Sequence, residues 1–163
     1  TNWDRHAIFF GAEGEFGFYK NYTSENFEDY GIMLSGQYDI TDDTYFMFAL
    51  SQAKRHIGRG SLLDPTASAP TEYEVTRQQF RFVRELGMLQ LKLNGQNEDV
   101  RLNDVTASGS PLTTLSERDN QEIGGEIRFE YMPGNALFLS GAYATTDYAL
   151  AGGSSRNAHG YDI

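Results

Sequence analysis

Apolar and polar residues alternate with a period of two along most of this chain, and this period constrains the fold more than any other feature. Successive side chains of a β-strand point to opposite faces, so such a segment has one apolar face and one polar face. An α-helix would instead repeat its apolar positions about every 3.6 residues. The clearest segment, residues 88–100, sets Leu89, Leu91 and Leu93 against Gln90, Lys92, Asn94 and Gln96.

The same alternation recurs in seven segments of roughly 11–13 residues, which we expect to form antiparallel strands. Strands of soluble proteins usually have about 5–6 residues, whereas a strand that crosses a membrane needs about 9–11. The segments span residues 6–19, 30–40, 45–56, 73–84, 88–100, 120–131 and 136–148, and residues 160–163 look like an eighth strand that is cut off at its beginning.

The connections between these segments alternate between short and long, as in outer-membrane barrels with short periplasmic turns and longer extracellular loops. Aromatic residues sit beside the short turns, where an interfacial girdle is expected: Tyr38, Tyr45, Tyr131 and Phe138. The short connections are 41–44, 85–87 and 132–135, and the long ones are 21–29, 57–72, 101–119 and 149–159.

Composition excludes several classes of protein. The formal net charge of -10 argues against duplex nucleic acid as a partner. The absence of cysteine excludes cysteine zinc sites and thiol chemistry. No stretch of about 18 apolar residues is present, which excludes a transmembrane helix but not barrel strands. The sequence begins at Thr1 without a Met and has no signal-peptide pattern, as expected of a processed or partial chain.

Two soluble folds share the alternation. A β-sandwich has an apolar inner face and a polar outer face, and a lipocalin-like barrel places its apolar side inward. Strand length, the aromatic girdle and the regular change of loop length favour a membrane barrel over both. We therefore predict an all-β fold, an antiparallel up-and-down transmembrane β-barrel, with about 7–8 strands in residues 1–163 as a single segment of a larger barrel.

Charged residues collect on the polar face of the predicted strands. Mixed charges that line a lumen would act on passing solutes, and the same groups would also pair across strands. Glu13 and Glu15 are same-face neighbours about 6–7 Å apart, which favours a pore-lining pair over a general acid and base. The predicted lumen-lining residues are Glu13, Glu15, Arg77, Arg81, Lys92, Glu126, Arg128 and Glu130.

The sequence contains no catalytic or metal-binding pattern. His6, His56 and His159 are scattered without metal-ligand spacing, and we expect His6 and His56 to be solvent-exposed in loops at strand ends. No nucleophile motif accompanies Ser61 or Ser116. We therefore predict no enzymatic activity, no cofactor and no metal.

Short motifs recur in a characteristic order between about Phe9 and Asp162. They are Arg59-Gly60-Ser61, Asp64-Pro65 and residues 69–73 in a long loop, then Arg118-Asp119, Glu130-Tyr131-Met132-Pro133, Asp147-Tyr148 and Gly160-Tyr161. In these motifs the chain resembles the porin-like outer-membrane barrels found with exopolysaccharide, capsule and O-antigen synthesis genes. The resemblance implies a Gram-negative outer membrane as the location, an even-stranded barrel larger than this segment, and a role in moving or organising surface polysaccharide. It supplies no catalytic residues.

The sequence departs from that family at its end. Barrels of this class finish with a strand ending in Phe or Trp, whereas this sequence stops at Tyr161-Asp162-Ile163. We therefore expect a chain that is truncated at one or both ends.

The leading functional prediction is a porin-like barrel of the bacterial cell envelope for export or organisation of polysaccharide or transport of hydrated solutes. Outer-membrane lipid is the expected partner, with polysaccharide, further barrel strands or another chain as further candidates. One alternative is a structural or interaction barrel whose long extracellular loops bind a surface partner. A second is an outer-membrane hydrolase, for which His56 and His159 lie near the long loops without a matching nucleophile.

The alternation also predicts which side chains meet lipid and whether the sheet closes. A closed barrel of seven or eight strands would be filled by side chains, and each desolvated ion in it would cost several kcal/mol. We therefore expect an open, curved sheet whose edge strands pair with further strands or another chain. Leu89, Leu91, Leu93, Ile123, Ile127 and Phe129 should point outward, and Gln90, Lys92, Glu126 and Arg128 should point into the lumen.

Overall fold

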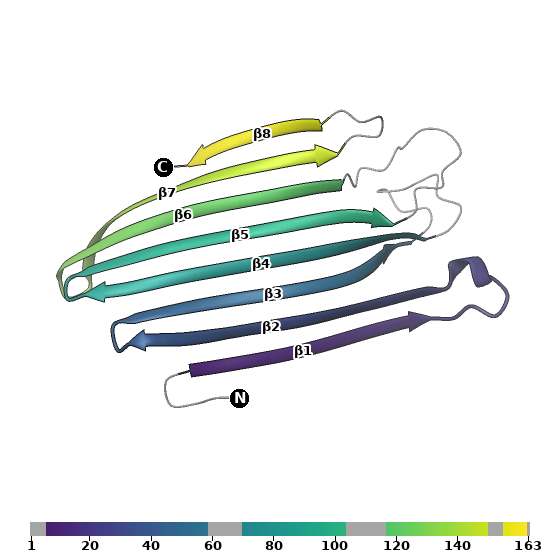
Figure 1. Cartoon of the computed structure of the whole chain (residues 1–163), viewed down its shortest axis with the longest axis horizontal. Helices are drawn as coiled ribbons and strands as arrows, with labels where there is room; N and C mark the ends of the chain where they lie inside the picture. Colours follow the sequence, from purple (N-terminus) through teal and green to yellow (C-terminus); the bar gives the residue numbers. More distant parts are fainter. Residues whose placement is uncertain (1–5, 59–69, 104–116, 150–154, 163) are drawn as a thin grey trace.

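Eight antiparallel strands form one sheet in which each strand pairs with its neighbours in the sequence (Figure 1). The computed structural model describes residues 6–58, 70–103, 117–149 and 155–162. A 3-10 turn, Thr23–Glu25, lies between the first two strands. The strands are β1 His6–Gly17, β2 Phe27–Thr41, β3 Thr44–Ile57, β4 Thr71–Leu86, β5 Leu89–Asn103, β6 Glu117–Met132, β7 Asn135–Ala149 and β8 Ser155–Asp162. The prediction of an up-and-down antiparallel sheet is confirmed.

The three short turns lie together at one end of the sheet, and the β1–β2 connection lies at the other (Figure 1). Two of these turns contain a glycine in the left-handed region, Gly87 with φ 62° and Gly134 with φ 79°. A side chain is disfavoured at such an angle because its Cβ approaches the following carbonyl oxygen. The β2–β3 and β6–β7 pairs each shift register beside their turn, as a β-bulge does.

Several strands extend beyond their predicted limits, and β8 is the largest case. It begins at Ser155 instead of Gly160, so the preceding connection is residues 150–154 and is shorter than predicted. The alternation could not find this start because Ser155–His159 has no apolar side. The extension is made by backbone pairing with β7, in which Arg156 lies opposite Tyr148.

The register separates the side chains into two faces, because residues opposite each other in an antiparallel pair share a face. We define the polar face as the odd-numbered residues of β1–β4 and the even-numbered residues of β5–β7. The apolar face holds the remaining positions. The register places on the apolar face every residue predicted to point outward: Leu89, Leu91, Leu93, Ile123, Ile127 and Phe129.

Two residues of the predicted aromatic girdle lie on the wrong face. Tyr38 is not one of the two: it lies on the apolar face, where its ring stacks on His6 with centroids 4.5 Å apart. Tyr45 lies opposite Asp39, and Phe138 lies opposite Arg128, so both belong to the polar face. Proximity to a turn selected these residues, whereas the parity of the pairing decides which side a residue points to.

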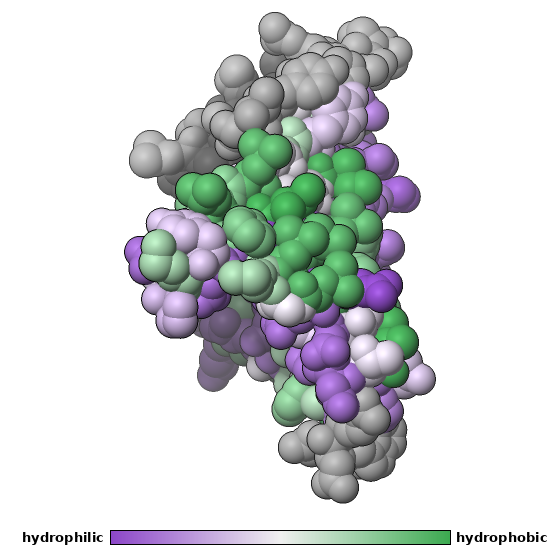
Figure 2. Space-filling model, turned by 90° about the vertical axis from the view of Figure 1, so that its left-hand side faces the viewer, coloured by the Kyte–Doolittle hydropathy of each residue, from purple (hydrophilic) through white to green (hydrophobic). Residues whose placement is uncertain are grey.

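No second layer covers the apolar face of the sheet among the residues that the structure describes. The buried apolar residues among those described are Ile57, Val83 and Val100, while Phe10 and Leu137 are 72% and 66% exposed. The chain exposes 11578 Å², whereas a compact protein of 18.3 kDa exposes about 8,100 Å². Seen from the end with the short turns, apolar residues gather into one area bordered by hydrophilic residues (Figure 2).

The sheet is open within the described residues. β1 pairs with β2 alone and β8 pairs with β7 alone, so no hydrogen bonds join the first strand to the last. The prediction that this segment does not close on itself is confirmed for this part of the chain. Among the same residues, no helix is long and apolar enough to cross a membrane.

Candidate functional site: the polar face of the sheet

Hollows in the surface identify the polar face as the concave side of the sheet. Of three hollows formed by described residues, the largest has a volume of about 630 Å³ and extends across β1–β6. Two smaller hollows, of about 290 Å³ and 270 Å³, open over β4–β7 on the same face. The side chains around the largest hollow that lie on the polar face are Ala7, Phe9, Ser35, Gln37, Met47, Ala49, Gln79, Arg81, Asn94, Gln96 and Glu122.

The floor of the largest hollow is strand backbone. Gly36, Phe48, Phe80 and Gly95 occupy one row of the register and point to the opposite face. There the Phe48 ring covers Gly36 and the Phe80 ring covers Gly95, since a Cβ built on either glycine would lie within 3.0 Å of the ring. This row therefore places two aromatic rings on the apolar face and leaves only strand backbone beneath the hollow on the polar face.

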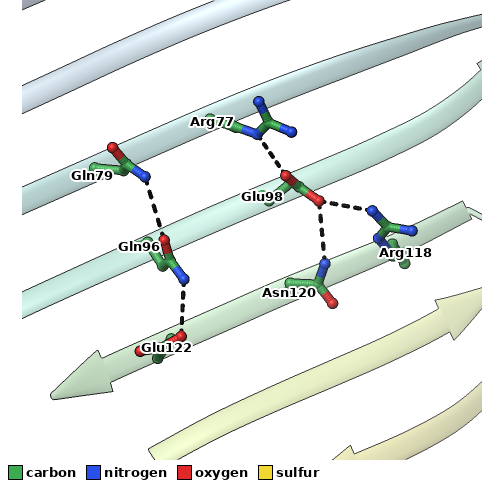
Figure 3. Close-up of polar contacts among 7 residues, drawn as sticks. All are labelled: Arg77, Gln79, Gln96, Glu98, Arg118, Asn120 and Glu122. Carbon is green, nitrogen blue, oxygen red and sulfur yellow. Dashed lines mark hydrogen bonds and ion pairs between the residues drawn. The ribbon is translucent and has the colours of Figure 1, made fainter. Parts of the chain in front are cut away.

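A ladder of polar side chains crosses β4, β5 and β6 beside this hollow (Figure 3). In its first row, Gln79 Nε2 donates to Gln96 Oε1 at 3.3 Å, and Gln96 Nε2 donates to Glu122 Oε2 at 2.9 Å. The Gln96 amide thus accepts from one neighbouring strand and donates to the other, and the Glu122 carboxylate ends the row.

The second row of the ladder centres on Glu98. Arg77 Nε donates to Glu98 Oε2 at 2.5 Å, and Glu98 Oε1 accepts from Arg118 at 3.0 Å and from Asn120 at 3.4 Å. The carboxylate thus holds two guanidinium groups, and the three charged groups together carry one net positive charge. Hydrogen bonds between ionised groups are the stronger kind, so this row fixes the side chains of three strands.

Further ion pairs cover the rest of the polar face. Lys92 Nζ lies 2.8 Å from Glu126 Oε1, and Arg128 lies 3.4 Å from Glu130 on the same strand. Arg55 on β3 reaches over β2 to Glu13 on β1. Gly31 lies opposite Glu13 in the register and leaves space beside the Glu13 carboxylate, because a Cβ there would be 3.3 Å from Glu13 Oε1.

The eight residues predicted from the sequence all lie on the polar face. Six of them take part in the ion pairs above: Glu13, Arg77, Lys92, Glu126, Arg128 and Glu130. The side chains of Glu15 and Arg81 form no hydrogen bond or ion pair with a described residue. The register thus brings the eight onto one surface.

Several residues of this surface were missed by the sequence reasoning. Glu98 and Glu122 share even numbering with Lys92 and Glu126, so the alternation could have found them. Arg118 was assigned to a loop because β6 was predicted to begin three residues later than it does. Arg55 was placed at a strand end, where the sequence gives no sign of a partner on β1.

The histidines do not lie in loops as predicted. His6 is in β1 and accepts a hydrogen bond from the Asp39 backbone N–H at 3.2 Å. His56 is in β3, where Nδ1 lies 3.0 Å from each Asp29 carboxylate oxygen. The Phe27 ring stacks on His56 at 3.8 Å, which half-buries the imidazole. The side chain of His159 lies outside the described residues.

Comparison with known proteins identifies one family. The family model described as "Putative beta-barrel porin 2" matches residues 1–163. No curated protein and no solved structure matches the chain. The match covers the entire sheet, including the concave polar face and both of its edges.

Proposed function

The chain belongs to the beta-barrel porin 2 family, and from this premise we propose that it forms part of an outer-membrane barrel whose polar face lines a water-filled lumen. The barrel passes hydrated solutes and serves the export or organisation of surface polysaccharide, without enzymatic activity. The observation that carries this proposal is the separation of the two faces: an apolar band, interrupted on β4 by Arg84, on the convex side and bonded polar groups on the concave side.

The apolar band supports the proposal through its course across the sheet. Its border towards the long connections is Ile32 on β2, Leu50 on β3 and Phe80 on β4. Ile32 lies opposite Gln52, and Leu50 lies opposite Gln78, so the border moves by one row from β2 to β3 and by one more from β3 to β4. A band that lies flat in a membrane therefore requires tilted strands, as in membrane barrels, where the tilt is about 35–45°.

The height of the band also suits a bilayer. On β6 it extends from Ile123 to Tyr131, and on β2 from Ile32 to Ile40. Nine residues at about 3.4 Å each, tilted by about 40°, span roughly 20–25 Å, which is close to the apolar band of about 25 Å in outer-membrane barrels. Beyond the band, the apolar face becomes polar at positions such as Asp99 on β5, which suits strands that extend past the membrane.

The open edges support a barrel with more strands. An unpaired strand edge inside a bilayer leaves backbone N–H and C=O groups without partners, and each costs several kcal/mol. We propose that β1 and β8 pair with further strands of the barrel or with another chain. The wider barrel would also keep the ion pairs of the polar face hydrated.

Planar-bilayer recording of the full-length protein tests the proposed transport. Stepwise ion currents that small polymer solutes reduce, and that polymers too large to enter leave unchanged, would support a water-filled lumen. A membrane-inserted protein without any conductance would contradict it and favour a structural or interaction barrel.

A further inference from the structure

Arg81 is the one basic residue of the polar face for which the described residues provide no partner. Arg55, Arg77, Lys92, Arg118 and Arg128 each lie within 4 Å of a carboxylate. Arg81 is exposed in the middle of β4 and borders the largest hollow. A charged group that the strands themselves do not neutralise is available to a solute.

No carboxylate among the described residues neutralises the positive charge of Arg81. The carboxylates of Asp39 and Glu122 lie two strands and one row away, and neither forms an ion pair with Arg81 in the described part of the chain: Asp39 accepts from Gln37, and Glu122 accepts from Gln96. Lys92 is nearer, and its own charge is matched by Glu126. The Arg77, Glu98 and Arg118 group beside the hollow adds a net positive charge.

The rest of the hollow has the groups that bind a sugar ring. Amides of Gln37, Gln79, Asn94 and Gln96 and the hydroxyl of Ser35 offer donors and acceptors to sugar hydroxyls. Phe9 and Met47, which are 59% and 38% exposed, offer apolar surface to its C–H groups. A volume of about 630 Å³ lies in the range of small-molecule sites.

We propose that this hollow binds an acidic saccharide unit, with the Arg81 guanidinium bonding to the sugar carboxylate. A guanidinium holds a carboxylate with two parallel hydrogen bonds, which a lysine ammonium cannot reproduce. The inference rests on the proposed function, because it names the class of solute that the lumen recognises: saccharides that carry carboxylates, in preference to neutral ones.

Block of the ion current by short oligosaccharides tests the inference in the full-length protein. Trigalacturonate should block the current at lower concentration than maltotriose. Arg81→Gln should weaken trigalacturonate binding about tenfold and should affect maltotriose binding much less, because maltotriose carries no carboxylate. Arg81→Lys should recover only part of the loss. Arg128→Gln is the matched control on the same face, outside the hollow, and should bind trigalacturonate as the unaltered protein does.

The outcomes separate this inference from the transport proposal. Equal binding of the two sugars, or binding that Arg81→Gln does not change, would overturn the acidic-saccharide site while leaving the conductance intact. If the protein does not conduct, calorimetric titration of trigalacturonate into the detergent-solubilised protein decides the same question through the Arg81 and Arg128 variants.

Discussion

Leu93 and Asn94 are adjacent in β5 but lie on opposite faces of the sheet. An arginine placed at each position in turn therefore tests which face meets lipid. Leu93→Arg would place a charge in the apolar band and should destabilise the folded barrel by about 2–4 kcal/mol. Asn94→Arg would place the same charge on the polar face and should change stability by less than about 0.5 kcal/mol. Unfolding in urea after insertion into lipid measures both, and equal effects would contradict a lipid-facing Leu93.

Glu98 bonds to two arginines that differ in exposure, which predicts two different coupling energies. The Arg118 side chain is 34% exposed, and that of Arg77 is 56% exposed. Water and salt screen the more exposed pair more strongly. Double-mutant cycles with Gln at each position should give a coupling of about 1 kcal/mol for Glu98–Arg118 and under about 0.5 kcal/mol for Glu98–Arg77. A larger coupling for Arg77 would show that its shorter hydrogen bond outweighs its exposure.

Residues inside the strands were predictable because parity alone assigns their face. Once Lys92 is placed on the polar side, the period of two places Glu126 and Arg128 with it through the pairing of β5 and β6. The partners of these residues were not predictable in the same way. A contact such as Arg55–Glu13 joins strands that are not neighbours and uses the space that Gly31 leaves beside Glu13, which no spacing along the sequence reveals.

Replacing either of the two turn glycines should lower the free energy of unfolding more than replacing a glycine whose φ lies outside the left-handed region. Gly87→Ala and Gly134→Ala each force a side chain into the left-handed region and should cost about 1–2 kcal/mol of folding free energy. Gly58→Ala is the matched control, because its Cβ would meet nothing within 4 Å and its φ lies outside that region. Urea midpoints of the three variants test this, and a loss at Gly58 as large as at Gly134 would refute it.

Strand ends were less predictable than strand centres for a physical reason. Alternation is strong only where one face needs apolar residues, which is the band that we place in the membrane. Beyond the band both faces are polar, as at Asp99 and Asn120, while backbone pairing continues. The sequence therefore shows where a strand meets the apolar band, and the length of β8 or the start of β6 emerges only from the pairing.

Whether β1 and β8 meet in a membrane decides how wide the barrel is. Eight strands can close into a small barrel, but its interior is then filled by side chains. The polar face would have to pack Arg81 and Glu15 without described partners and the net positive group around Glu98, and removing ions from water costs several kcal/mol each. A wider barrel keeps these groups in water, so it is the more stable arrangement.

The natural absence of cysteine allows this closure to be tested by disulfide cross-linking. A disulfide forms only when the two Cα atoms lie within about 7 Å. Gly11→Cys on β1 combined with Gly160→Cys on β8, and the same β1 cysteine combined with Ala158→Cys, should form no disulfide within one chain in membranes. Gly11→Cys with Met33→Cys is the positive control, because these residues lie opposite each other on β1 and β2 and should cross-link readily. Efficient cross-linking of β1 to β8 would show that eight strands close on themselves, and it would replace a solute-filled lumen with a barrel packed by its own side chains.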